Sequence, residues 1–214
     1  MLIGNDIVDL KDVDAYPAME SSNYLNRVFR PIEQLQIKNS ANPRKLLWMI
    51  WTLKESGFKA WKRQNPKMIF SPISIHVDIE KKKISHHQYG KLKFEIDDGD
   101  DDWIAVYVFN SNLEKRSTLL HWIGEVSKLS EGFHLNSSVA VRTLVSQRLG
   151  AFLNLPPESI EVTKELPPMV KESKTGSIQP VSLSHHGRYV SAFMVLPRTM
   201  KSLFYEKLST SHSV

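Results

Sequence analysis

The sequence contains no cysteine. This absence excludes a disulfide framework, a cysteine-ligated zinc or iron–sulfur site, and a thiol nucleophile. Long apolar runs are also missing, because the longest, Leu46–Trp51, is far too short to span a bilayer. The first ten residues have no basic start and reach Asp6 before an apolar run can form. We therefore expect no signal peptide and a cytoplasmic location.

What is present is an ordinary globular composition, with 41% apolar and 24% charged residues in a chain of 214. This length fits one large domain or two small ones that share a core. The formal net charge is +5, and four of these five excess charges fall in residues 113–214. Such a basic balance suggests an anionic partner, which leaves phosphate-rich cofactors, acidic proteins and nucleic acids open.

A similar series of elements is expected in each half of the chain, residues 1–112 and 113–214. The predicted helices are Tyr24–Ile37, Pro43–Arg63, Leu119–Leu129, one that starts at Asn136 or Ser137 and carries a buried stripe of Val139, Leu144, Leu149 and Leu153, and a short one after Pro197. The predicted strands are Leu2–Leu10, Ile73–Ile79, Lys91–Asp97, Trp103–Phe109, Ser159–Glu165, Pro180–His186 and Arg188–Leu196. Helices followed by strands, twice over, predict an α+β fold of two similar lobes in a pseudo-two-fold arrangement.

The first candidate for chemistry is the segment GNDIVDL, which starts at Gly4. Gly4 lets the backbone pass close to a neighbour, and Asp6 presents a carboxylate near the end of a strand. The simplest interpretation is an aspartate that caps a turn.

The second candidate is WTLKESGFKAWKR, in which Glu55 and Lys59 are four residues apart and share one helix face. A surface ion pair is the ordinary explanation of such a spacing. The alternative is that Glu55 lies close to Asp6, since two carboxylates from separate elements would complete a Mg²⁺ site with phosphate oxygens and waters. Lys59 would then face the same phosphates.

Two further features lie in the second half. Ser184 and His185 end a predicted strand in SLSHHGRY, where a histidine is more often hydrogen-bonded than a ligand. Arg142 and Thr143 lie within a predicted helix, and Arg142 either faces solvent or clamps a phosphate. The other histidine pair, at positions 86 and 87, is interpreted as a solvated turn with no chemical role.

Together these segments resemble the 4′-phosphopantetheinyl transferases. GNDIVDL is similar to the G-x-D-[IV]-[VE] strand motif of that superfamily, and SLSHHGRY to its S-x-S-H-[ST]-G segment. The most specific match is WTLKESGFK to W/F-x-x-K-E-[AS]-x-x-K. The length resembles that of the two-lobed Sfp-type members, whereas the motif order is that of the short AcpS-type members. The chain thus looks circularly permuted relative to the Sfp type.

The resemblance implies a set of roles. Asp6 and Glu55 would bind Mg²⁺, which holds the pyrophosphate of coenzyme A, and Lys59 would steady the transferred phosphate or the leaving oxygen. Ser184 and His185 would contact nucleotide phosphates, and Arg142 with Thr143 the 3′-phosphate or ribose. A serine of an acidic acyl or peptidyl carrier protein would attack, 3′,5′-ADP would leave, and the proton would go to Glu55 or to a metal-bound water. The fused lobes would make a monomer sufficient, with no nucleic acid or membrane as partner.

The sequence departs from the family pattern in a few places. Val8 stands where many Sfp-type members carry a third metal-binding acid, and Asn5 where an apolar residue is usual. Pro167 stands where a phosphate-binding lysine is expected, with Lys164 and Lys171 as candidates to replace it. Two rival functions remain at this point. One is a catalytically inactive module of the same fold that binds coenzyme A or carrier proteins, and the other is a basic nucleic-acid-binding protein.

Overall fold

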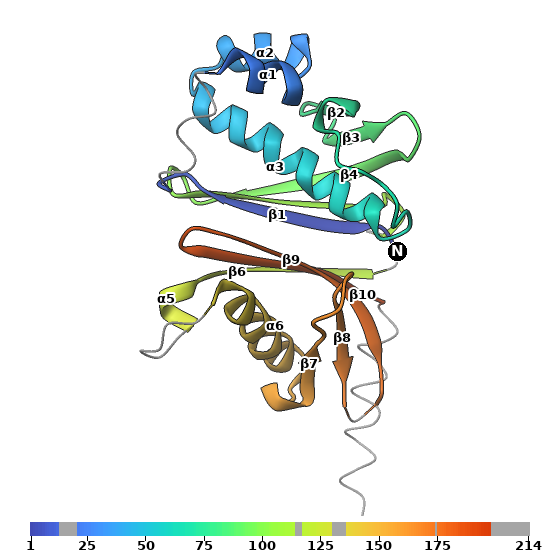
Figure 1. The fold of residues 1–214 in the computed structure, drawn as a ribbon. Helices are drawn as coiled ribbons and strands as arrows, with labels where there is room; N and C mark the ends of the chain where they lie inside the picture. Colours follow the sequence, from blue (N-terminus) through green and yellow to red (C-terminus); the bar gives the residue numbers. More distant parts are fainter. Residues whose placement is uncertain (13–20, 114–116, 130–135, 174, 198–214) are drawn as a thin grey trace, which may run out of the picture.

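A computed structural model describes residues 1–12, 21–113, 117–129, 136–173 and 175–197. Two five-stranded sheets lie face to face between two long helices, so that the molecule has a helix–sheet–sheet–helix arrangement (Figure 1). The first sheet has the strand order β1-β5-β4-β3-β2 and the second β6-β10-β9-β8-β7. All paired strands are antiparallel. This confirms the α+β class and the two similar lobes.

The first lobe begins with a strand, continues with three helices and ends with four strands. These are β1 (Ile3–Asp9), α1 (Ser22–Val28), α2 (Pro31–Lys38), α3 (Pro43–Lys62), the 3₁₀ turn η3 (Pro72–Ser74), β2 (Ile75–Asp78), β3 (Lys83–His86), β4 (Gly90–Asp98) and β5 (Trp103–Phe109). The second lobe repeats this plan. It contains β6 (Ser117–Glu125), α5 (Val126–Leu129), α6 (Ser137–Leu153), the turn η4 (Pro157–Ser159), β7 (Ile160–Val162), β8 (Met169–Glu172), β9 (Ile178–His186) and β10 (Tyr189–Pro197). The two strand orders therefore correspond position by position.

The helix α3 is defined by its ends and by one apolar face. The side chain of Asn42 caps it by accepting a hydrogen bond from the Lys45 N–H at 3.0 Å, and Pro43 occupies the first turn. Leu47, Ile50 and Leu53 are fully buried against the first sheet. Burial of three such side chains contributes about 1.5–3 kcal/mol each. The predicted Pro43–Arg63 helix is thus observed almost to the residue.

Gly4 brings β1 and α3 into direct backbone contact. A Cβ atom at this position would lie 2.1 Å from the Ser56 carbonyl oxygen and 2.9 Å from the Ala60 nitrogen. Only glycine allows so close an approach. Because β1 and α3 are so close, the side chain of Asp6, two residues further along β1, contacts Lys59 of α3.

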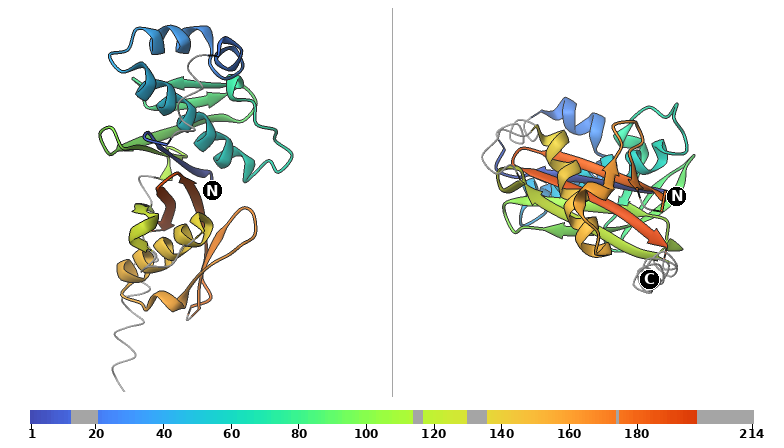
Figure 2. Two further views of the ribbon diagram at one scale, coloured as in Figure 1. Left: turned by 60° about the vertical axis from the view of Figure 1, so that its left-hand side comes forward. Right: turned by 90° about the horizontal axis from the view of Figure 1, so that it is seen from below.

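The helix α6 covers the second sheet as α3 covers the first (Figure 1), and the view from below in Figure 2 has α6 in front of its sheet. Its N-cap is Asn136, whose side chain accepts from the Ser138 N–H at 2.8 Å. Leu144, Leu149 and Leu153 are buried as predicted, but Val139 is 48% exposed. Val139 was wrongly assigned to the stripe because it lies in the first turn, beyond the edge of the sheet-facing surface.

Two secondary-structure predictions were wrong, and two strands were not predicted. The predicted Tyr24–Ile37 helix is broken into α1 and α2, because Arg30 before Pro31 is held extended. The predicted Leu119–Leu129 helix is the strand β6 followed by the short α5, because residues of β6 form a ladder with β10, distant in sequence. The strands β3 and β8 were not predicted. The predicted helix after Pro197 lies outside the described residues.

The two lobes share a third apolar cluster. Ile3 and Ile7 of β1 and Tyr107 and Phe109 of β5 pack against Phe193 of β10 and its neighbours. The Tyr107 and Phe193 rings are 5.4 Å apart between centroids, and the Phe109 and Phe193 rings 6.0 Å. This cluster holds the two sheets together and fixes how β1 faces β9.

None of the described helices combines the length and the apolar composition that a bilayer-spanning helix requires.

Candidate functional site

The free edge of β1 is covered by alternate side chains of β9. The N–H groups of Asn5 and Ile7 donate to the Oγ atoms of Ser182 (3.0 Å) and Ser184 (3.2 Å). The Asp9 N–H donates in the same way to Nδ1 of His186 at 3.2 Å. Because successive N–H groups on one strand edge are two residues apart, three side chains at the same spacing can satisfy them. This seam sets the register between the lobes.

Asp6, Lys59 and Ser184 form a compact polar cluster at the middle of the seam. Ser184 Oγ donates to Asp6 Oδ1 at 2.6 Å, and Lys59 Nζ donates to the same oxygen at 2.9 Å and to Ser184 Oγ at 3.4 Å. Asp6 and Ser184 are buried, at 5% and 4% exposure. The structure thus brings together residues from β1, α3 and β9.

Glu55 joins this cluster from the preceding turn of α3. Its carboxylate lies 3.5 Å from Lys59 Nζ, so that one ammonium group is shared by Asp6 and Glu55. Burial, followed by the negative charge of Asp6, raises the pKa of Glu55 despite the opposing effect of Lys59. For Lys59, burial acts to lower the pKa, but Asp6 and Glu55 outweigh it and the pKa is raised. Lys59 therefore remains a cation between two acids.

The donor set of this cluster suits a hard divalent cation. Two carboxylates from separate elements converge on one positive charge, and carboxylate oxygens are the ligands that such a cation prefers. Val8 supplies no third acid, since it is 2% exposed and packs in the core of the first lobe. Within the described part of the chain, no three His, Cys, Asp or Glu side chains come together at a metal-binding distance. Asp6 and Glu55 could hold a divalent cation only together with ligands from outside the protein.

A cavity of about 590 Å³ lies beside this cluster, between the lobes. Its lining combines residues of α3 with residues of α6, β9 and the segment around Pro167 and Pro168. The basic lining residues are Lys59, Lys62, Arg63, Arg142 and His185. No aspartate or glutamate is among its described lining residues. A cavity of this size and charge can hold a phosphate-bearing small molecule.

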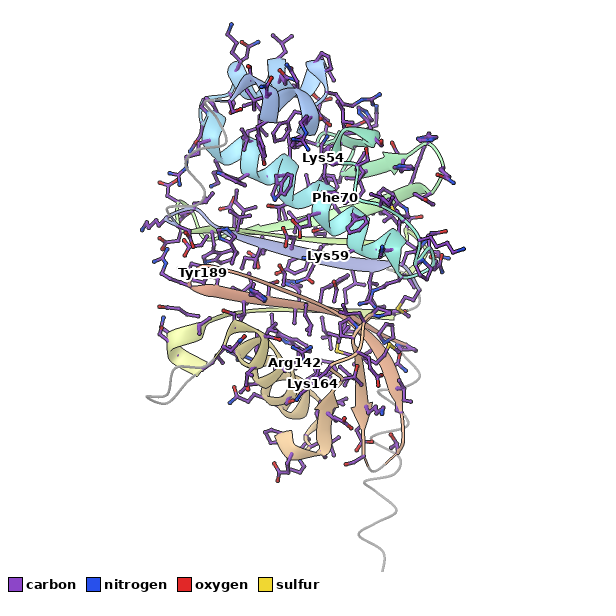
Figure 3. The ribbon with its side chains drawn as sticks, viewed as in Figure 1. Lys54, Lys59, Phe70, Arg142, Lys164 and Tyr189 are labelled. Atoms are coloured by element: carbon purple, nitrogen blue, oxygen red, sulfur yellow. The ribbon has the colours of Figure 1, made fainter. Side chains whose placement is uncertain are left out.

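Arg142 lines this cavity from α6, and Figure 3 shows it across the paired sheets from Lys59 on α3. Its Nη1 donates to the carbonyl oxygen of Ser138 at 2.7 Å, and Nη2 to that of Thr163 at 3.4 Å. Its Nε is buried without a hydrogen-bond partner among the described residues. A guanidinium held by neutral carbonyls keeps its charge available to an anion.

The other predicted residues differ in their placement. His185 lines the cavity, and burial together with the charge of Lys59 lowers its pKa, which favours the neutral ring. Thr143 is half-buried on α6 but does not line the cavity, so the structure does not bring it to Arg142's site. Lys164 and Lys171 are exposed and also lie outside the lining.

His86 was interpreted from the sequence as a solvated turn residue, and this was wrong. It lies in β3, is 8% exposed and packs on Trp61, with 5.8 Å between the ring centroids.

Lys62 and Arg63 also line the cavity, although the sequence analysis gave neither a functional role. The signal was available for Arg63, because Glu55, Lys59 and Arg63 follow one another at intervals of four residues on one helix ridge. Lys54, adjacent to Glu55 in the helix motif, has a different place. It is completely buried on the far side of α3, where it pairs with Glu33 at 2.7 Å.

Comparison with known proteins gives one match. The family model for the 4′-phosphopantetheinyl transferase superfamily matches residues 2–128, which is more than half of the chain. The matched range contains Asp6, Glu55 and Lys59, and ends before Arg142, Ser184 and His185. No curated protein matches the chain.

Proposed function

The chain belongs to the 4′-phosphopantetheinyl transferase superfamily, and we propose that it transfers the 4′-phosphopantetheine group of coenzyme A to a serine of an acyl or peptidyl carrier protein. Membership of the superfamily makes phosphopantetheinyl transfer the general class of its activity. The specific reaction proposed is that of a holo-acyl-carrier-protein synthase. It releases 3′,5′-ADP and requires Mg²⁺.

One observation carries the proposal. The two carboxylates of Asp6 and Glu55 share Lys59 at the edge of a cavity whose charged lining is entirely basic. A site for a nucleotide alone would need only the basic lining. Two acids beside it are what a phosphoryl-transfer site needs for a divalent cation.

Asp6 and Glu55 would hold Mg²⁺. When bound, the ion would supply positive charge to the diphosphate oxygens and so stabilise the charge that develops during transfer. Lys59 would contribute a second cation to the same phosphates. Ser184, which donates to Asp6, orients that carboxylate.

In the proposed reaction the serine oxygen of the carrier protein attacks the phosphorus that bears the pantetheine group. The new bond is between that oxygen and phosphorus, and the bond that breaks joins the phosphorus to the oxygen bridging the diphosphate. That oxygen leaves on 3′,5′-ADP. The proton of the serine hydroxyl would pass to Glu55 or to a water molecule. Arg142 and His185 would bind the phosphates of the nucleotide, and Thr143 is left without a proposed contact.

Each lobe would supply a different part of the site. Residues 1–112 would supply the acids and Lys59, and residues 113–214 most of the nucleotide site. Because both parts are in one chain, a monomer would be sufficient. The net charge of +5 suits an acidic carrier protein as partner, and a cytoplasmic location would give access to it.

The test is incubation of the purified protein with coenzyme A, Mg²⁺ and apo carrier proteins of the fatty-acid, polyketide and nonribosomal-peptide types. We expect a mass increase of one phosphopantetheine on at least one of them, with loss of this change in excess chelator. A folded protein that binds coenzyme A and modifies no carrier would instead be a binding module of the same fold. Salt-sensitive oligonucleotide binding without coenzyme A binding would point to the nucleic-acid alternative.

A further inference from the structure

A second cavity, of about 480 Å³, lies at the edge of the first sheet opposite to β1. Residues of β2, β3 and β4 line it together with one residue at the start of α2, elements that are labelled in Figure 1. It shares no described lining residue with the cavity between the lobes. The proposed function therefore leaves this second cavity without a role.

Three polar side chains of this lining form a row across the sheet. His76 of β2 is paired with Ser85 of β3, and Ser85 is paired with Lys91 of β4. Residues directly opposite one another on antiparallel strands have their side chains on the same face, with Cβ atoms about 4.5–5.5 Å apart. An imidazole, a hydroxyl and an ammonium group therefore lie side by side along the cavity.

The neighbouring pair of residues shows which face of the sheet this row occupies. Ile75 and His86 are paired with each other, and both are buried on the side of α3, where the His86 ring packs on Trp61. Successive residues of a strand point to opposite faces of a sheet. The half-buried His76 and Ser85 thus lie on the face that α3 does not cover.

Further basic side chains surround this row. Arg30 lines the cavity beside the outer edge of β2, where the Val77 N–H donates to Glu33 Oε1 at 3.4 Å, and His87 lines it from the turn after β3. The described lining contains no aspartate or glutamate, and neither Arg30 nor Lys91 forms an ion pair within the described ranges. Basic groups that converge from separate elements without acidic partners favour binding of an anion.

Two histidine ring nitrogens in this lining lack hydrogen-bond partners within the part of the chain that the structure describes. Nδ1 of His76 is buried and unpaired. Nδ1 of His86 accepts from the Gln88 N–H at 3.1 Å, so that Nε2 carries the hydrogen of the neutral ring and has no acceptor. Burial, followed by the charge of His87, lowers the pKa of His86 and favours this neutral form. A ligand with several oxygen atoms would satisfy such donors.

We propose that this cavity binds the phosphate groups of a small soluble anion, with inorganic diphosphate as the simplest ligand. Guanidinium, ammonium, imidazole and hydroxyl groups all donate hydrogen bonds, and those from charged donors to phosphate oxygens are strong. The cavity volume is within the range of small-molecule sites, about 300–1,000 Å³, which leaves room for more than one phosphate group. The inference does not depend on the proposed function, because the two cavities are lined by different residues.

The test is titration of the isotope-labelled protein with inorganic diphosphate at pH 7, without Mg²⁺ and at constant ionic strength, followed by NMR of the backbone amides. The cavity between the lobes is also basic, so the two must be observed separately. The amides of Ser85 and His86 report on the second cavity, and those of Ser182 and His185 report on the cavity between the lobes.

The variants are Lys91→Gln, which removes one charge, and His76→Gln, which removes the imidazole. Lys83→Gln is the matched control, because Lys83 is exposed on β3, two residues before Ser85, and lies outside the lining. Thermal unfolding without ligand shows whether each variant is folded. If His76→Gln does not fold, the exposed Lys91 decides the test by itself.

We expect saturable shifts of the Ser85 and His86 amides, with the same dissociation constant in wild type and Lys83→Gln. Lys91→Gln and His76→Gln should each raise that constant by roughly tenfold, the effect of one hydrogen bond to a charged group. The dissociation constant reported by Ser182 and His185 should not change in any variant.

Three results would overturn the proposal. One is that diphosphate shifts the Ser85 and His86 amides no more than sodium chloride does at the same ionic strength. Another is wild-type affinity in the folded Lys91→Gln variant. The third is an equal loss of affinity in Lys83→Gln, which would mean that diffuse surface charge attracts the anion. Each of these results would leave the proposed function intact.

Discussion

Arg188 of the second lobe binds Asp9 of the first through three hydrogen bonds. Its Nε and Nη2 donate to the two carboxylate oxygens, each at 2.8 Å, and its backbone N–H donates at 3.0 Å. The turn before it requires Gly187, which has a φ of +50° and whose Cβ would lie 2.7 Å from Asp9 Oδ2. This pair closes the seam between β1 and β9 at the end where both strands turn.

The Asp9–Arg188 pair predicts acid-sensitive stability. Burial would raise the pKa of Asp9, but the hydrogen bonds from Arg188 and Lys11 outweigh it and lower the pKa from 3.8 to about 2. A carboxyl with a lowered folded-state pKa stabilises the protein above pH 3.8, and this contribution is lost as the pH falls toward 2. We expect Arg188→Gln to remove roughly 2 kcal/mol at pH 7 and to flatten the unfolding free energy over this pH range. Urea unfolding as a function of pH measures both effects.

Arg148→Gln is the matched control for that experiment, since Arg148 is exposed on α6. Its stability should follow the wild-type pH profile. An Arg188→Gln profile that also follows it would contradict the role given to the pair.

Glu55→Gln should abolish most of the transfer activity. The substitution keeps the size of the side chain but removes one of the two acids that share Lys59. We expect the rate of phosphopantetheine transfer to fall by roughly a hundredfold or more, as when a charged group at a phosphoryl-transfer site is lost. Thermal unfolding should change little, because the Glu55 side chain is a third exposed. Glu80→Gln, in an exposed turn, is the control, and wild-type transfer by Glu55→Gln would overturn the metal-site assignment.

Ser184→Ala should lower both stability and activity. It leaves the Ile7 N–H without its acceptor and Asp6 without its 2.6 Å donor. We expect a loss of about 1–3 kcal/mol in unfolding free energy and a fall in transfer rate of roughly tenfold.

Ser191→Ala provides the comparison, because Ser191 is equally buried between the lobes and accepts from Asn5 Nδ2 at 3.0 Å. Ser191→Ala should lower the unfolding free energy by a similar amount while leaving the transfer rate unchanged. Equal losses of activity in the two variants would mean that Ser184 acts only through the packing of the lobes.

Lys54→Met should destabilise the first lobe without a direct effect on the site. Lys54 Nζ donates to Glu33 Oε2 at 2.7 Å and to the carbonyl oxygens of Val28 and Pro72 at 2.9 and 3.0 Å. Removing one member of a buried ion pair leaves the other charge unpaired, at a cost of about 3–5 kcal/mol. Lys45 is on the same helix as Lys54, and Lys45→Met, which breaks its partly exposed pair with Asp98 of β4, should cost less than about 1 kcal/mol. Denaturant unfolding measures the unfolding free energy of the two variants. Equal values would contradict this role for Lys54.

Much of the fold could be predicted because it depends on local periodicity. The helix α3 has a cap, a first-turn proline and a continuous apolar stripe, all of which are visible in the sequence. The strand β6 could not be predicted in this way. Only its pairing with β10 over nine residues fixes it as a strand.

The residues of the candidate site could likewise be predicted only where a local motif contains them. Local motifs were sufficient to indicate the superfamily, and they singled out Asp6, Glu55, Lys59, Arg142, Ser184 and His185. Thr143 was included because it follows Arg142 in sequence, but adjacent helix positions face different directions. Arg63 was overlooked because its neighbours in space, Ile3 and Val181, are 60 and 118 residues away in sequence.

The sequence by itself determined the superfamily, the two-lobed α+β plan and the residue types of the site, because each depends on short motifs and on the period of apolar residues. It also excluded thiol chemistry through the absence of cysteine. Only the tertiary structure decided that the acids share one lysine, that Val8 packs into the core, and that two arginines held by carbonyl oxygens line one cavity. These relationships depend on the register between β1 and β9, which arises when side chains of one lobe satisfy the backbone N–H groups of the other.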